Sequence, residues 1–199
     1  MVVKGKHAPL WFDLLISGEL TTDLDERRAA IPASEHPGSR AIAEVACIAA
    51  LAGRELGPQV HAIDPTVGCG FMLATLSRAL RHSGAEVHAL GVDINTEAAR
   101  VAEESLASST DGFEVKRGNV LTADLLPSHA AELVVYEPPW GVDWRSEQRA
   151  ITERETAGWY PFGLGPVSDS GWLFHQRALS ALRPASEGGG RLVTFLNAT

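Results

Sequence analysis

The 199 residues are 45% hydrophobic and 21% charged, so the chain has enough apolar material to bury one substantial core. The formal net charge of −8 disfavours contact with a phosphate backbone by this segment alone. The two cysteines and seven histidines show neither a disulfide framework nor a metal-ligand spacing, and the apolar stretch near the start is too short to span a bilayer. This composition predicts a cytoplasmic protein with no metal and no membrane partner.

Residues 1–38 are predicted to form an N-terminal helical segment that precedes the main domain. Apolar spacing predicts one helix over 11–20 and another over 39–56, and the turn residues of 35–38 separate them. We therefore divide the chain into an N-terminal segment, 1–38, and a core domain, 39–199.

A glycine-containing turn follows the first predicted strand of the core domain. Apolar residues predict a strand over 60–63 and a helix over 71–81, which places the turn between them. Glycines there let the backbone approach a ligand closely, and the first amides of a helix suit a phosphate or a carboxylate. An ordinary strand-to-helix turn is the alternative. The candidate cofactor contacts in this turn are Asp64, Pro65, Gly68 and Gly70.

Two details of this turn favour a sulfonium cofactor over a dinucleotide. The dinucleotide fingerprint has a third glycine where this chain has Leu73. The carboxylate of Asp64 would repel a pyrophosphate but suits a cationic ligand.

Two further strands are predicted to bring polar side chains to the same edge. The strand over 87–94 ends at Asp93 and Ile94, about 20 residues beyond the glycines, where a ribose-binding acid is expected. Asp93 could alternatively cap the helix that begins near Thr96. The strand over 113–120 ends at Asn119 and Val120. The Asn119 amide can bond an adenine edge, although asparagine after glycine is equally typical of a turn.

The fourth predicted strand, 132–136, delivers Glu137, Pro138, Pro139 and Trp140 to this edge. An aromatic amine is a poor nucleophile, and a side-chain oxygen together with a proline carbonyl can accept both of its hydrogens. The two prolines stiffen that carbonyl, and the tryptophan can stack on an extruded base. These four residues are the candidate catalytic set. A buried Pro-Pro turn with an exposed Glu137 is the structural alternative.

In these segments the chain resembles the gamma-type class I DNA adenine N6-methyltransferases, particularly the modification subunits of type I restriction-modification systems. The resemblance covers roughly 42–197. It implies S-adenosyl-L-methionine as cofactor, the N6 amine of adenine in DNA as acceptor, and a DNA-recognition domain or subunit lying outside this chain. The matching segments are 64–73, 91–93, 118–119, 137–140, 162–163, 168–169, 174–184 and the fifth predicted strand, 191–196.

One position departs from that family. The family's tetrapeptide begins with Asn, whereas this chain has Glu137, whose extra methylene moves the oxygen and which lacks the amide donor. The Glu-Pro-Pro start resembles the non-catalytic partner of the heterodimeric messenger-RNA adenosine methyltransferase. A cofactor-binding but inactive module, or a methyltransferase acting on a protein amide or another amine, is therefore the alternative. A nicotinamide-dependent reductase comes third, and Leu73 and the Pro-Pro pair oppose it.

The predicted fold is a three-layer α/β sandwich, Rossmann-like, with a mostly parallel sheet in the order 3-2-1-4-5. The chain stops after the fifth strand, so we expect it to be a piece of a longer polypeptide. The long connection 141–170 contains Trp144 and Trp159, which we predict to line the base pocket; packing on the sheet is the alternative.

Overall fold

A computed structural model describes residues 19, 23, 24, 47 and 56–195 of the chain. The two predicted N-terminal helices and the boundary at residue 38 lie outside the described residues, apart from isolated positions, and stay predictions. In the part that the structure describes, no helix is both long and apolar enough to cross a membrane.

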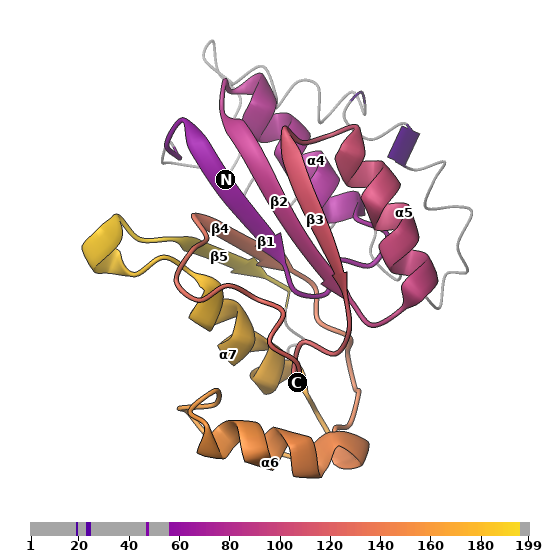
Figure 1. Ribbon diagram of the computed structural model, residues 1–199, viewed down its shortest axis with the longest axis vertical. Helices are drawn as coiled ribbons and strands as arrows, with labels where there is room; N and C mark the ends of the chain where they lie inside the picture. The colour runs from indigo at the N-terminus through magenta and orange to yellow at the C-terminus, as the bar shows by residue number, and fades with distance from the viewer. Residues whose placement is uncertain (1–18, 20–22, 25–46, 48–55, 196–199) are drawn as a thin grey trace.

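The described domain is built on a five-stranded sheet in the order β3-β2-β1-β4-β5, and every pairing between neighbours is parallel (Figure 1). This order confirms the topology predicted from the sequence. Because parallel strands end at one edge, the turns after β1, β2, β3 and β4 all meet there. The strands are β1 (Gln59–Asp64), β2 (Glu86–Asp93), β3 (Gly112–Arg117), β4 (Leu133–Tyr136) and β5 (Arg191–Thr194).

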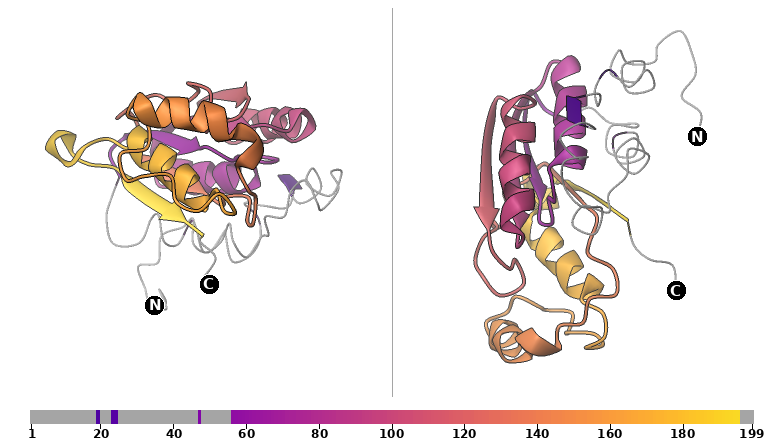
Figure 2. Two further views of the ribbon diagram at one scale, coloured as in Figure 1. Left: turned by 90° about the horizontal axis from the view of Figure 1, so that it is seen from below. Right: turned by 90° about the vertical axis from the view of Figure 1, so that its right-hand side faces the viewer.

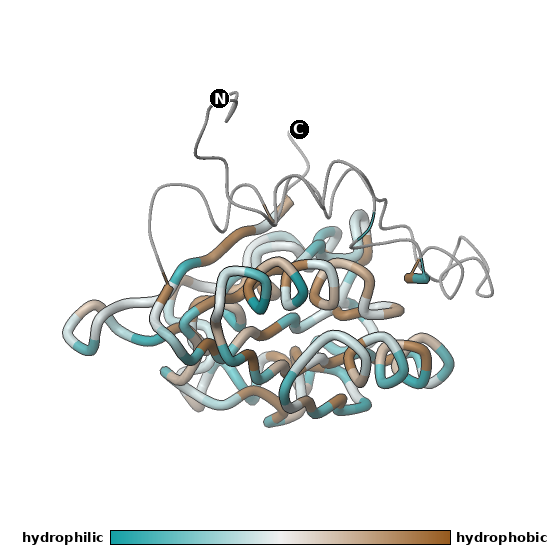
Figure 3. The backbone as a smooth tube through the Cα atoms, turned by 90° about the horizontal axis from the view of Figure 1, so that it is seen from above, coloured by the Kyte–Doolittle hydropathy of each residue, from teal (hydrophilic) through white to brown (hydrophobic). Residues whose placement is uncertain are grey.

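Helices cover the sheet on both faces and complete the predicted three layers. α4 (Phe71–His82) and α5 (Thr96–Ala107) pack on one face, and α7 (Gly171–Ala181) packs on the other (Figures 1 and 2). One apolar cluster joins Leu73 and Leu106 to the sheet, and a second joins Leu173 to it. Apolar stretches accordingly follow the central strands, whereas hydrophilic segments lie along the outer turns (Figure 3). Apolar burial between the layers is the main stabilising contribution.

The connection 141–170 contains a helix that the sequence pattern did not predict. A short 3₁₀ turn, η2 (Arg145–Glu147), leads into α6 (Gln148–Thr156), which lies below the carboxyl ends of the strands (Figures 1 and 2). Within α6 only Ile151 is buried. A helix with one buried residue has no apolar periodicity to detect, which is why sequence reasoning missed it. A second 3₁₀ turn, η3 (Ala185–Glu187), precedes β5.

Part of the α7 face of the sheet is polar. Among the described elements no helix lies between β3 and β4, and the amino ends of β1 and β2 are not covered on that face. The strands carry Gln59, His61, Glu86 and His88 there, and the two imidazole rings stack with their centroids 5.6 Å apart. The polar composition allows this half of the face to contact water.

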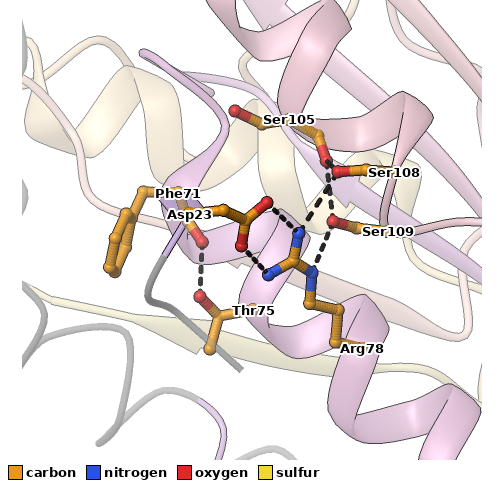
Figure 4. A network of polar contacts seen from close by, with 7 residues as sticks. All are labelled: Asp23, Phe71, Thr75, Arg78, Ser105, Ser108 and Ser109. Atoms are coloured by element: carbon orange, nitrogen blue, oxygen red, sulfur yellow. Dashed lines mark hydrogen bonds and ion pairs between the residues drawn. The ribbon is translucent and has the colours of Figure 1, made fainter. Parts of the chain in front are cut away.

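A polar network joins the N-terminal segment to the α4 and α5 layer (Figure 4). The Arg78 guanidinium donates to both carboxylate oxygens of Asp23, at 2.6 and 2.8 Å, and its Nε donates to the Ser109 hydroxyl at 2.8 Å. The adjacent Leu24 is buried in the apolar cluster of this layer. A bidentate pair beside buried apolar contact fixes this point of the N-terminal segment on the domain.

Close approach of the turn after β1 to β2 requires a glycine at position 91. A Cβ at Gly91 would lie 2.9 Å from both Cγ atoms of Val67, which is inside van der Waals contact. We expect Gly91→Ala to lower the free energy of unfolding by on the order of 1–3 kcal/mol, because the turn must move. Chemical denaturation measures this. Gly57→Ala is the control, since a Cβ there meets its nearest atom at 3.9 Å. Equal stability of the two variants would contradict the prediction.

Candidate functional site

The turn after β1 brings an open backbone position to the carboxyl edge. Gly68 has a φ of 53°, and a Cβ built there meets no atom within 4 Å. Gly70 has a φ of 79°, but a Cβ there would lie 3.0 Å from the Cα of Ala102. Gly70 is therefore needed to pack α4 against α5, whereas Gly68 faces free space. α4 begins directly after Gly70 and has no side-chain cap, and the dipole at a helix N-terminus attracts a carboxylate or a phosphate.

Asp93, at the end of β2, holds this turn in place. Its Oδ2 accepts the Gly68 amide and its Oδ1 accepts the Asn95 amide, each at 2.8 Å. Asn95 caps α5, because its side chain accepts the amides of Glu97 and Ala98. The N-cap of α5 is therefore Asn95 and not Asp93, and the role of Asp93 as a ribose ligand stays a prediction. The neighbouring Ile94 leaves 70% of its side chain exposed at the same edge.

The turn after β3 lies against Asp93. The Gly118 amide donates to the Asp93 carbonyl at 2.9 Å, which places Asn119 beside the candidate ribose acid. The Asn119 Oδ1 accepts the Leu121 amide at 3.0 Å, whereas its Nδ2 donates to no described residue. Asn119 thus forms the turn and still presents a donor. The side chain of Val120 is buried in the α7 core, so only its backbone is placed to meet a ligand.

A hydrogen bond from Thr66 joins the turn after β1 to the predicted catalytic set. Its hydroxyl donates to the Glu137 carbonyl at 2.9 Å, and its amide donates to the Asp64 Oδ1 at 2.9 Å. The Pro138 side chain is buried, whereas Trp140 is 52% exposed. Pro139 is also exposed. Sequence reasoning did not single out Thr66; a hydroxyl inside the turn 64–70 was the available signal.

Three carboxyl groups make this edge electrostatically unusual. Asp64 is 1% exposed, and burial raises its pKa to about 8, with further contributions from the charges of Asp93 and Glu137. Burial also raises the pKa values of Asp93 and Glu137. Such a cluster suits a cationic ligand. In the described part of the chain, no three His, Cys, Asp or Glu side chains are grouped to hold a metal ion.

Exposed aromatic side chains stand near the same edge, at the start of α7. Phe162 is 67% exposed, yet its backbone amide donates to the buried side chain of Gln176 at 3.0 Å. Its ring lies 6.3 Å from Trp172, which stacks on His175 at 5.7 Å. The His175 Nδ1 lies 3.1 Å from the hydroxyl of Tyr136, the residue before Glu137. The chain thus holds an aromatic surface next to the predicted catalytic set.

The two tryptophans predicted to line a base pocket have different surroundings. Trp144 is 4% exposed in the α7 core, and its Nε1 donates to the Pro166 carbonyl at 3.0 Å. Trp159 lies between the guanidinium groups of Arg154 and Arg177. The prediction is wrong for Trp144, whose ring is buried in the core. Trp159 is half-buried beside the two guanidinium groups, and its role in a base pocket stays a prediction.

The sequence profile of the N-6 DNA methylase family matches residues 41–195, which include every candidate site residue described above. The chain belongs to the N-6 DNA methylase family. This is the family in which the resemblance of the motifs had placed it. No curated protein matches the chain.

Solved structures share the fold of this N-6 DNA methylase. A protein described as a class I S-adenosylmethionine-dependent methyltransferase from Listeria monocytogenes matches with a TM-score of 0.64 and 18% identity, over 92% of this chain and 53% of that one. A type I restriction-modification methyltransferase subunit from Streptococcus thermophilus matches with a TM-score of 0.63 and 18% identity, over 79% of this chain and 34% of that one. The chain thus spans about half or less of these structures, and the likeness shows the class I methyltransferase fold.

The buried Asp64 predicts a pH-dependent stability. Its pKa rises from an ordinary 3.8 to about 8 on folding, so between these values the native protein holds a proton that the unfolded chain has released. The free energy of unfolding should therefore fall as pH rises through this window. We expect Asp64→Asn to flatten that slope and to be more stable than the native chain at pH near 8 by about 2–5 kcal/mol.

Denaturant titrations across pH 4 to 8 measure this difference in the free energy of unfolding. Asn is the suitable substitution because its side-chain oxygen can still accept the Thr66 amide. The exposed Glu187→Gln is the control and should keep the native slope. An unchanged slope in Asp64→Asn would show that Asp64 is not the group responsible.

Proposed function

We propose that the chain is the catalytic core of an S-adenosylmethionine-dependent methyltransferase that acts on the N6 amine of adenine in DNA, within a restriction-modification type system. Membership of the N-6 DNA methylase family supports this proposal, as does the fold. DNA binding is assigned to a recognition domain or subunit outside this chain, because the net charge of −8 disfavours phosphate contact.

The observation that carries the proposal is the hydrogen bond from Thr66 to the Glu137 carbonyl. It places the predicted cofactor turn directly beside the predicted catalytic set, so a methyl donor held by the turn would lie next to the amine acceptors. The bond uses the Glu137 carbonyl and leaves the Pro138 carbonyl for the substrate amine.

The residues present fit S-adenosylmethionine. Gly68 faces free space, and α4 begins directly after this turn, so its N-terminal dipole would attract the carboxylate of the methionine moiety. Asp93 would hold the ribose hydroxyls, with Ile94 exposed beside it for the adenine ring. Asn119 would donate to the adenine edge. When bound, the sulfonium supplies an electrophilic methyl group.

The catalytic set is arranged to hold an aromatic amine. The Glu137 carboxylate and the Pro138 carbonyl would each accept one amine hydrogen, which directs the nitrogen lone pair toward the cofactor side. The exposed ring of Trp140 would stack on the base. Because the pKa of Glu137 is raised by burial, acidification would remove its acceptor charge earlier than for an exposed glutamate.

Cofactor binding is the first step to test. We expect calorimetric titration to show saturable binding of S-adenosylmethionine and of its demethylated product. Asp93→Ala should raise the dissociation constant at least about tenfold, because it removes the ribose acceptor and frees the Gly68 amide.

Asp111→Ala is the matched control for this titration. Asp111 also accepts a backbone amide of β2, from Val87 at 2.9 Å, but at the opposite end of that strand. The Asp111→Ala variant should bind the cofactor with the affinity of the native chain. Absence of binding by the native chain would reject the proposal, and equal weakening by both variants would reject the assignment of Asp93.

Glu137 favours a second function, that of a cofactor-binding but inactive module. The position that would aim the amine carries a longer acidic side chain in this chain, and its burial raises its pKa. Such a module would retain the cofactor turn and support a separate catalytic partner.

Two substitutions separate the functions. We expect Glu137→Asn to create or raise transfer of labelled methyl groups from S-adenosylmethionine to adenine in DNA, by about tenfold or more, because it restores both the shorter reach and the amide donor. Glu137→Gln supplies the amide without shortening the side chain. Gain in the Asn variant alone identifies reach as the limit, whereas gain in both identifies the missing donor. No transfer by any of the three chains, with cofactor binding intact, would favour the inactive module.

A further inference from the structure

Three successive carbonyl groups of the turn after β3 each accept a hydrogen bond from the α6 and α7 region. The Arg177 Nε donates to Val120 at 3.3 Å, the Tyr160 hydroxyl to Leu121 at 2.5 Å, and the Arg154 Nε to Thr122 at 2.8 Å. We name this set of donors, Arg154, Tyr160 and Arg177, the carbonyl clamp.

The carbonyl clamp is rigid because its members are packed against one another. Trp159 lies between two of them, with the Arg177 Cζ 3.9 Å and the Arg154 Cζ 4.5 Å from its ring centroid. Tyr160 and Arg177 are buried, at 2% and 5% exposure. Two guanidinium groups stacked on one indole are fixed in orientation, so the donors they present are fixed as well.

The clamped turn is the one that carries Asn119. Its amides at Thr122 and Ala123 donate to the Asn119 carbonyl, and the Leu121 amide donates to the Asn119 side chain. These bonds and the clamp together restrain the backbone from Asn119 to Ala123, and the Asn119 Nδ2 donates to no described residue. A donor on a restrained turn binds its partner with less loss of conformational entropy than one on a free loop.

We infer that Arg154, Tyr160 and Arg177 are positioning residues that set the orientation of Asn119 and so determine selectivity for the adenine base of the cofactor. This inference rests on the proposed function, because it assumes that Asn119 faces the cofactor. It assigns a role to the connection 141–170: the segment that follows Trp140 braces the cofactor's adenine end.

The test compares two ligands that differ at the adenine edge. The N1 atom of S-adenosylhomocysteine can accept from the Asn119 Nδ2, whereas S-inosylhomocysteine carries a proton on N1 beside a 6-oxo group and offers no acceptor at that atom. We expect the native chain to prefer the adenine ligand in calorimetry. Tyr160→Phe and Arg154→Gln should weaken S-adenosylhomocysteine binding by roughly three- to tenfold and affect the inosine ligand less, so that the preference falls.

Arg149→Gln is the matched control, since Arg149 lies on α6 as Arg154 does but, among the described residues, pairs only with Glu153 on its own helix. It should keep the native preference. Hydrogen exchange of the unliganded chain adds a second readout: the Leu121 to Ala123 amides should exchange faster in Tyr160→Phe than in Arg149→Gln. Should Tyr160→Phe fail to fold, Arg154→Gln, a substitution at a half-buried side chain, carries the comparison.

Three results would overturn the inference and leave the proposed cofactor function standing. These are equal affinity of the native chain for the two ligands, native affinities in both clamp variants, and equal weakening of both ligands, which would indicate a structural role only. A native chain that binds neither ligand would reject the proposed function itself, and the inference with it.

Discussion

The turn after β1 is restrained from both sides, and the candidate site depends on this restraint. The Asp93 carboxylate accepts the Gly68 amide from the β2 side, and the Thr66 hydroxyl donates to the Glu137 carbonyl on the β4 side. β2 and β4 are the two neighbours of β1 in the sheet, so the turn is fixed to both adjacent strand ends. A turn held in this way keeps its glycine backbone and its acid in one arrangement, which is the condition for binding a ligand without reorganisation.

Burial of Asp64 lowers the stability of the fold at neutral pH and also makes this edge suited to a cationic ligand. The carboxyl group sits at the end of β1 with its pKa raised to about 8, and the Thr66 amide compensates its burial only in part. Burial and neighbouring acids destabilise the charged form of a carboxyl group. Proteins retain such groups where a ligand supplies the opposite charge. The same residue therefore explains a pH-dependent stability and an edge suited to a cation.

The connection after Trp140 supplies both an exposed aromatic side chain and side-chain hydrogen-bond donors. It presents the exposed Phe162 ring 6.3 Å from Trp172, and it supplies Arg154 and Tyr160 to the turn that carries Asn119. α6 is joined to the rest of the domain by the buried Ile151 and by the bond from Arg154 to the Thr122 carbonyl. The long connection therefore contacts the turn that carries Asn119, which the proposed function places at the cofactor.

The sequence by itself determined the strands, their parallel order and the edge at which Asp64, Asp93, Asn119 and Glu137 meet. Buried parallel strands are continuous apolar segments in the sequence, and their carboxyl ends lie at the same edge of the sheet. Local sequence patterns were therefore enough to predict the strands and this edge. Only the tertiary structure decided the bond of Thr66, the helix α6 and the burial of Trp144. The Tyr160 hydroxyl and the Leu121 carbonyl lie 39 residues apart, and no local periodicity encodes such a pair. The side-chain contacts that restrain the candidate residues arise from packing between distant segments, which is the physical reason why the sequence predicted those residues but not the contacts that hold them in place.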